Sequence, residues 1–333
     1  MKAVVYTEFG PPEVLHLIEV EKPTPKDNEI LIKVYACSVG YGDLAARNFR
    51  SITPREFNMP SLLWVPTKLV FGLRKPRIRI LGAELAGEVE AVGKDVTRFR
   101  VGDQVYGYPG QSFGANAEYI CMRETGSVAL KPANMTYEEA ATVPYGAMMA
   151  LSLLKKASIR PGQKVLIIGA SGSIGSYALQ LAKHYGAEVT GVCGTARVDM
   201  VKALGAAHVI DYTQEDFTQN GQQYDVIFDV LGKTTFPRAE NSLTAKGTIL
   251  YVSFKLPHLL HMLRTARSGG KKAICSISGE GFEYLDTIRE LVEAGAITTV
   301  VARTFPLEQA AEAHRYAESG QRTGHVVITS GAR

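Results

Sequence analysis

The chain has 333 residues, which predicts two domains, and its 46% hydrophobic and 21% charged residues are typical of a globular protein. The formal net charge of +4 gives nucleic-acid binding no support, and no apolar run is long enough to span a bilayer. The four cysteines lack CxxC spacing, so neither a disulfide framework nor a zinc ribbon is indicated. The start MKAVVYTEFG does not resemble a signal peptide, and we expect a cytoplasmic protein.

The first 130 residues are rich in short strand patterns separated by turn signals. The turns are indicated by the Gly- and Pro-rich stretches FGPPE and KPTPKDN and by GKD. The predicted strands, several with apolar alternation, are KAVVYTEF, EILIKVYACSV, AELAGEVEAVG, RVGDQVYGY and NAEYICM. Because no helix pattern alternates with these strands, we predict an antiparallel, barrel-like β domain.

One segment of this half, residues 49–79, is unusually rich in Leu, Pro, Arg and Lys. We expect it to be an insertion or a lid. One interpretation of its composition is an insertion of helix and loop that packs against the rest of the protein. The other is an apolar cover over a substrate site, or a patch that contacts a membrane surface.

From about residue 135 the pattern changes to alternating helices and strands. Residues 135–157 are predicted to form one helix with Thr136 as its N-cap, residues 235–247 to be helical, and residues 255–270 to form an irregular loop. Further helices are predicted at 173–186 and 198–205, and strands at 164–170, 187–194, 208–212, 224–232, 247–254 and 273–278. Several of these strands are apolar throughout, as in a sheet covered on both faces, so we predict a doubly wound parallel α/β sheet.

The tail of the chain returns to strand patterns. Helices are predicted at 282–295 and 307–319, and strands at 298–305 and 324–330. These late strands predict that the tail completes the first domain. We therefore expect one domain from residues 1–130 completed by 299–333, and a second from residues 131–298.

A glycine-rich turn, GASGSIG, lies between a buried strand and an amphipathic helix. Gly169, Gly172 and Gly175 allow a tight turn, close approach of backbone to a diphosphate, and close packing of helix on strand. Free N–H groups at the helix N-terminus favour phosphate oxygens. A merely tight turn is the alternative, but the strand–turn–helix–strand context favours a dinucleotide, with Ser171, Gly172, Ser173, Ile174 and Gly175 as the binding residues.

The end of the next strand indicates which dinucleotide binds. An NAD site usually has Asp or Glu there to accept from the ribose, whereas VTGVCGTARV has none and offers Gly194, Thr195 and Arg197 instead. Arg and hydroxyl donors suit a 2′-phosphate, so we predict NADP(H). A solvated Arg197 is the alternative. Tyr212, after the third strand, is a candidate to stack near the adenine, or an ordinary packing residue.

These features together resemble the medium-chain dehydrogenase/reductase superfamily, in its quinone oxidoreductase (zeta-crystallin-like) branch. The resemblance spans nearly the whole chain in family order, through GAELAGEVEAVGKDV, RVGDQVYG, MTYEEAATVP, GASGSIGSYALQLAK, LGAAHVIDY, FDVLG and GHVVI. It implies a Rossmann domain inserted into a GroES-like catalytic domain, with the cofactor between them, and a homodimer.

The alcohol-dehydrogenase branch of this family holds catalytic zinc through a Cys, a His–Glu pair and a further Cys. The resemblance places these positions at Gly40, at Ala83 with Glu84, and near Val143, so only Glu84 matches. Cys37 is expected in the core. Because Zn²⁺ needs several N or S ligands, we predict that the protein binds no metal.

The resemblance also places Tyr41 where the family chain passes the nicotinamide, as a candidate hydrogen-bond donor or as a residue that lines the wall. Gly40 stands where the family's quinone reductases often have Asn. Asp43 matches the family pattern and is expected to be structural.

Four more residues are candidates for cofactor contact. Ser253 and Phe254 follow the fifth strand of the predicted sheet, at the carboxyl edge where ligands bind. Arg322 and His325 lie in the returning tail, with surface exposure as the alternative.

The sequence therefore predicts an NADPH-dependent, zinc-independent reductase that transfers hydride to a quinone or an α,β-unsaturated carbonyl. The developing oxyanion then needs only a hydrogen-bond donor or water. An NADP-dependent alcohol/carbonyl dehydrogenase is one alternative, and a non-catalytic NADPH-binding protein is the other.

Overall fold

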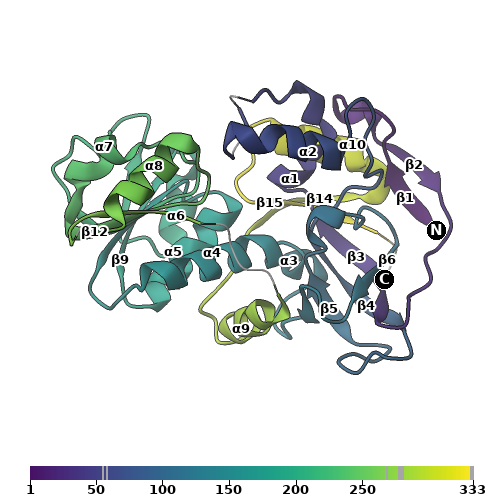
Figure 1. Cartoon of the computed structure of the whole chain (residues 1–333). Helices are drawn as coiled ribbons and strands as arrows, with labels where there is room; N and C mark the ends of the chain where they lie inside the picture. The colour runs from purple at the N-terminus through teal and green to yellow at the C-terminus, as the bar shows by residue number, and fades with distance from the viewer. Residues whose placement is uncertain (55, 58, 268, 277–280, 331–333) are drawn as a thin grey trace. The chain divides into compact units, whose positions relative to one another are not determined.

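The computed structural model describes residues 1–330 except 55, 58, 268 and 277–280 (Figure 1). The undescribed positions include parts of the predicted segments 49–79, 255–270, 273–278 and 299–333. The chain divides into two compact units, Met1–Thr53 with Pro66–Tyr145 and Glu280–Arg333, and Pro54–Val65 with Gly146–Gly279. No helix among the described residues has the length and apolar composition needed to cross a bilayer.

The first unit is built on a seven-stranded sheet whose path is β14-β15-β3-β4-β5-β7, with β6 also paired to β3. All of its pairs are antiparallel except β14 with β15. Its strands are β3 (Glu29–Ser38), β4 (Leu85–Val92), β5 (Gln104–Gly107), β6 (Tyr119–Arg123), β7 (Val128–Leu130), β14 (Val301–Pro306) and β15 (His325–Thr329). The hairpin of β1 (Lys2–Val5) and β2 (His16–Glu19) forms a separate small sheet.

The tail of the chain enters this sheet beside its early strands. Strand β15 pairs antiparallel with β3, so that Ile328 lies opposite Cys37. The helices of the unit are α1 (Tyr41–Arg47), α3 (Tyr137–Ala140), α9 (Phe282–Glu293) and α10 (Ala310–Glu318); α2 (Trp64–Phe71) begins in the other unit's sequence.

The second unit is a six-stranded, wholly parallel sheet in the order β10-β9-β8-β11-β12-β13, which confirms the predicted doubly wound fold. The strand order reverses between β8 and β11, the neighbours at the centre. The strands are β8 (Lys164–Ile168), β9 (Glu188–Cys193), β10 (His208–Asp211), β11 (Tyr224–Asp229), β12 (Leu243–Tyr251) and β13 (Lys272–Cys275). The helices are α4 (Pro144–Ala157), which starts in the first unit's sequence, α5 (Ser173–His184), α6 (Val198–Ala203), α7 (Phe236–Ala239) and α8 (Leu256–Thr265).

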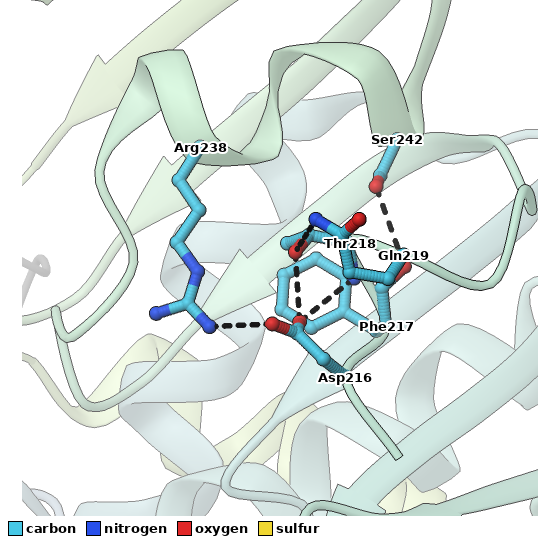
Figure 2. A network of polar contacts seen from close by, with 6 residues as sticks. All are labelled: Asp216, Phe217, Thr218, Gln219, Arg238 and Ser242. Carbon is cyan, nitrogen blue, oxygen red and sulfur yellow. Dashed lines mark hydrogen bonds and ion pairs between the residues drawn. The ribbon is translucent and has the colours of Figure 1, made fainter.

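A polar network holds the long connection from β10 to β11 (Figure 2). The Asp216 carboxylate accepts from the N–H and hydroxyl of Thr218 at 2.9 and 2.8 Å and pairs with Arg238 of α7 at 2.7 Å. The Ser242 hydroxyl donates to the Phe217 carbonyl at 3.4 Å, and the Phe217 ring is buried in the unit's core. These contacts fasten a loop without regular structure to the neighbouring helix.

Two predicted helices were wrong in part. Residues 135–157 form α3 and α4 rather than one helix, because Pro144 starts a new helix and disfavours helical backbone at Val143. The Thr136 cap itself is confirmed, since its hydroxyl accepts the Glu139 N–H at 3.2 Å. Residues 243–247 are strand, because pairing of Leu243 with Tyr224 of β11 overrides the weak local preference.

The sequence patterns also missed two short strands, β2 and β7, and two helices. Residues 256–265, predicted as loop, form α8, whose start is stabilised by the Lys255 N–H donating to the His258 ring at 3.0 Å. Helix α1 lies inside the half predicted to form an antiparallel, barrel-like β domain. It is short and contains Gly42, so its local propensity is low, and its start is instead set by Asp43 accepting the Gly40 N–H at 2.9 Å.

Candidate functional site

The glycine-rich turn lies at the carboxyl end of β8, where the strand order reverses and doubly wound sheets bind their ligands. Gly169 has a φ of +84°, and its N–H donates to the Val192 carbonyl of β9 at 3.2 Å. The Gly172 N–H closes the turn on the Gly169 carbonyl at 3.0 Å, and α5 begins at Ser173. The chain is thus bent so that the N-terminus of α5 faces the switch point.

The other two glycines of the motif serve different purposes. A Cβ at Gly175 would lie 2.1 Å from the Gly169 carbonyl oxygen, so packing inside the protein requires glycine there. A Cβ at Gly172 would meet only that same oxygen, at 3.4 Å, which is ordinary contact. Nothing within the described part of the chain therefore requires glycine at position 172, which is exposed and open to a ligand.

One polar atom at this turn lacks a partner among the described residues. The Ser173 hydroxyl is buried and makes no hydrogen bond, at the first position of α5 where helical N–H groups also have no intrahelical acceptor. A phosphate oxygen would satisfy both kinds of donor, and the helix dipole favours its charge. The turn therefore fits the diphosphate of a dinucleotide, while Ser171 lies half-buried ahead of it and Ile174 is buried.

The structure brings Gly194, Thr195 and Tyr212 together at the carboxyl ends of β9 and β10. The Tyr212 N–H donates to the Cys193 carbonyl at 3.0 Å, and its hydroxyl lies 3.2 Å from where a Cβ of Gly194 would stand. The Tyr212 side chain is 64% exposed, so packing at the strand end does not account for it. Arg197 ends the single 3₁₀ turn that follows Gly194.

A carboxylate that the sequence patterns did not single out also lies here. The Thr195 hydroxyl donates to Asp211 of β10 at 2.5 Å, and this contact, with the Thr213 N–H and hydroxyl, lowers the pKa of Asp211. The usual place for such an acid is the end of the second strand, whereas Asp211 ends the third. The parallel pairing sets Asp211 directly beside Cys193, which is why it reaches the same corner.

Asp229, at the end of β11, organises the other side of the switch point. Its buried carboxylate accepts the N–H groups of Leu231, Gly232 and Thr234 at 3.0, 2.9 and 3.0 Å. Burial raises the pKa of Asp229 to about 6, and the three N–H donors oppose that rise. The turn so formed sets Leu231 within 3.3 Å of a Cβ position at Gly169, so it borders the glycine-rich turn.

Ser253 follows β12 and lies against this turn, because a Cβ at Gly232 would be 2.1 Å from the Ser253 carbonyl oxygen. Phe254 is buried in the core of the unit. Ser253 therefore shares its edge of the sheet with the glycine-rich turn, as the sequence predicts.

In the first unit two buried carboxyl groups lie beside Gly40. Glu84 Oε1 accepts the Tyr145 N–H at 2.8 Å, and Oε2 lies 2.5 Å from the Ser38 hydroxyl. Burial raises the pKa of Glu84 to about 8, opposed by these two contacts, and the nearby Asp43 charge raises it further. Burial also raises the pKa of Asp43 to about 6, and the hydrogen bonds from the N–H groups of Gly40 and Gly82 oppose that rise.

These residues do not fit a zinc site. Both oxygens of Glu84 already have partners, and Gly40, Ala83 and Val143 offer no N or S ligand. The Cys37 thiol is buried and donates to Asn116 Oδ1 at 3.1 Å. Across the described part of the chain, no three His, Cys, Asp or Glu side chains are grouped so that they could hold a metal.

The remaining candidates lie in the first unit. Tyr41 is the first residue of α1 and is 57% exposed. Arg322 and His325 are neighbours, since burial and the Arg322 charge together lower the pKa of His325 to about 4.

Glu84 gives the protein a specific pH dependence. Its pKa is higher in the folded state, so the folded protein binds more protons and its unfolding free energy falls as pH rises towards about 8. Between about pH 6 and 8, Glu84→Gln should reduce that downward slope by up to about 1.4 kcal/mol per pH unit, the value for one proton. Urea unfolding across this range measures the slope, with exposed Glu19→Gln as control; equal slopes for wild type and Glu84→Gln would contradict it.

Comparison with known proteins agrees with this architecture. The alcohol dehydrogenase GroES-like domain family matches residues 26–152, and the zinc-binding dehydrogenase family matches residues 204–328. The chain is 32% identical to the mouse mitochondrial NAD(P)H oxidoreductase RTN4IP1, over 98% of this chain and 89% of that protein. It is 30% identical to a tomato 2-methylene-furan-3-one reductase, over 98% and 79%. The solved structure of a quinone oxidoreductase from Coxiella burnetii matches with a TM-score of 0.83 at 29% identity, covering 100% and 99% of the two chains.

Proposed function

Because the chain belongs to the medium-chain dehydrogenase/reductase superfamily, in its quinone oxidoreductase-like branch, we propose that it is an NADPH-dependent, zinc-independent reductase of quinones and α,β-unsaturated carbonyls. The chain is an oxidoreductase that uses a nicotinamide cofactor, with a GroES-like domain and a Rossmann-like parallel sheet. The observation that carries the cofactor site is the exposed turn at Gly172, beside the Ser173 hydroxyl that has no partner among the described residues.

Different residues of the chain would bind the cofactor and stabilise the reacting acceptor. The turn from Ser171 to Gly175 binds the diphosphate, and the Asp229-held turn with Ser253 borders the same edge of the sheet. When bound, the reduced nicotinamide supplies a hydride to the acceptor. The hydroxyl of the exposed Tyr41 donates a hydrogen bond to the oxyanion that forms on the acceptor. Arg322, in the returning tail, contacts the cofactor. The proposed GroES-like domain consists of residues 1–130 and 299–333, and the proposed Rossmann domain consists of residues 131–298.

We propose a zinc-independent enzyme because the residues around Glu84 offer none of the N or S ligands that zinc needs. An activated alkene or a quinone accepts hydride without a Lewis acid, whereas a simple carbonyl usually needs stronger polarisation. The names of the tomato and Coxiella relatives, a furanone reductase and a quinone oxidoreductase, support the same two acceptor classes. The proposal further includes a homodimer. The cytoplasmic location stays a prediction, since the mouse relative is named mitochondrial.

The proposed activity is tested by mixing the protein with NADPH and a panel of quinones and enones and following the cofactor's absorbance. Turnover of either class is the expected result. Tight NADPH binding without turnover across the panel would favour a non-catalytic binding protein. Turnover of simple ketones or alcohols alone would favour the dehydrogenase alternative.

We base the proposed preference for NADP(H) over NAD(H) on Arg197 and on the exposed Tyr212 beside Gly194. Asp211, which accepts from Thr195, is the group in the same corner that suits a ribose hydroxyl instead. We expect Arg197→Ala to weaken NADPH binding about tenfold more than NADH binding, because only NADPH carries the 2′-phosphate. Calorimetry with both cofactors measures the ratio, with the exposed Lys202→Ala of α6 as matched control. Equal losses for the two cofactors would remove Arg197 from the phosphate site.

A further inference from the structure

Helix α2 is apolar on both its buried and its exposed sides. Towards the protein it presents Trp64, which is buried and edge-on to Phe57, and Phe71, which stacks on Phe49 with ring centres 4.9 Å apart. A helix at a protein surface normally turns polar residues outward. The outward residues of α2 are instead Val65, Pro66, Leu69 and Val70, all exposed.

Basic residues follow this apolar face directly. The helix ends at Phe71. The N–H of the following Gly72 donates to the Lys68 carbonyl at 2.8 Å, and Leu73 after it is 62% exposed. Arg74, Lys75, Arg77 and Arg79 come next, all exposed. None of them forms an ion pair with another described residue.

The charge of this surface is uniformly positive along the chain. No Asp or Glu occurs between Glu56 and Glu84. We call this surface the α2 ridge; it consists of Val65, Pro66, Leu69, Val70, Leu73, Arg74, Lys75, Arg77 and Arg79.

The apolar and basic side chains of the α2 ridge indicate what kind of surface it would bind. Apolar side chains on a helix, with unpaired cations beside them and no acidic residue in the same stretch of chain, match a surface that is apolar inside and negatively charged outside. An anionic lipid bilayer has this layering. A second copy of the chain does not match, because a two-fold contact through the ridge would set its cations against the same cations.

We propose that the α2 ridge docks this protein on anionic lipid membranes, with Leu69, Val70 and Leu73 entering the interface and the four cations contacting lipid phosphates. Arg74 and its neighbours are placed for this because only Gly72 and Leu73 separate them from the end of the helix. Docking of this kind lies in the membrane plane and needs no spanning helix. It is independent of the chemistry at the cofactor site, although quinones and enones with apolar tails partition into the same membranes.

The test is sedimentation of the whole protein with vesicles of phosphatidylcholine alone and of phosphatidylcholine with about a third phosphatidylglycerol. The wild type should bind the anionic vesicles at least about tenfold more tightly than the neutral ones. Arg74→Gln/Lys75→Gln/Arg77→Gln should remove most of that difference, and Leu69→Ser/Leu73→Ser should weaken binding to anionic vesicles. All five side chains are exposed, so these variants should fold and should reduce a water-soluble quinone as the wild type does.

Matched controls come from exposed residues elsewhere. Lys26→Gln/Arg160→Gln/Lys246→Gln removes the same charge, and Val101→Ser removes an apolar side chain that is 62% exposed, like Leu73. Both controls should bind anionic vesicles like the wild type. Equal binding of the wild type to both vesicle types, no binding, or equal losses in the controls would overturn the proposal. So would ridge variants that change only the oligomeric state, since that result would assign the surface to a second copy.

Discussion

Gly175→Ala is expected to destabilise the parallel-sheet unit by about 3 kcal/mol and to abolish measurable cofactor binding. The added methyl group would stand 2.1 Å from the Gly169 carbonyl oxygen and 2.7 Å from its carbon. Both are backbone atoms, so relief requires α5 to move away from the end of β8. That movement displaces the N–H groups that we assign to the diphosphate. Urea unfolding measures the first effect and calorimetry with NADPH the second.

Gly172→Ala is the control that separates folding from binding at the same turn. Its methyl group meets the Gly169 oxygen at 3.4 Å, and its φ of −84° suits alanine, so the free energy of unfolding should change little. The exposed methyl would nevertheless hold a diphosphate away from the backbone, and we expect NADPH affinity to fall at least about tenfold. Unchanged affinity in a well-folded Gly172→Ala protein would show that the phosphates bind elsewhere.

Arg47→Met is expected to destabilise the first unit by about 3 kcal/mol, because the acceptors that Arg47 now binds would lose their hydrogen-bond donor. Arg47 is 1% exposed, and it donates to the Gly10 carbonyl and the His314 ring, each at 3.1 Å, and to Glu318. Burial, with the Arg47 charge, lowers the pKa of His314 to about 3, so the ring is neutral and its Nδ1 can accept. Methionine keeps much of the packing volume but satisfies none of these acceptors.

The matched control is Arg315→Met, which breaks the ion pair with Glu13. Both partners are more than half exposed, and exposed pairs of this kind contribute about 0.5 kcal/mol. Urea unfolding of both variants gives the comparison. A loss at Arg47 no larger than the loss at Arg315 would show that the buried contacts do not stabilise the fold. Because α1 ends at Arg47 and begins at Tyr41, a loosened α1 should also raise the KM of the acceptor.

Asp229 shows how a buried acid can shape the loop that borders the glycine-rich turn. It gathers three N–H groups of one turn and so sets Leu231 against Gly169. The motif FDVLG carries part of the family resemblance, but the sequence alone gives its Asp no role, which only the three N–H contacts supply. We assign Asp229 a positioning role rather than a catalytic one, because backbone N–H groups occupy both of its carboxylate oxygens.

The sequence alone was sufficient for features whose cause is local. The turn of Gly169 and Gly175, the apolar strands of the parallel sheet and the Thr136 cap each depend on residues a few positions apart. Backbone conformation and alternating burial act over that range, so the doubly wound sheet and the position of its glycine-rich turn could be predicted.

Only the tertiary structure decided the features that join distant residues. Asp211 reaches Thr195 because two strands pair in parallel, and Glu84 meets Tyr145 across 61 positions of chain. Arg47 meets His314 across 267 positions, and strand β12 begins at Leu243 because that residue pairs with Tyr224 of β11. The exposed apolar face of α2 is of the same kind, since the sequence shows that the helix is apolar but not which side the core leaves uncovered. Such contacts have no local sequence signal, because their free energy comes from burial and pairing that exist only once the chain has folded.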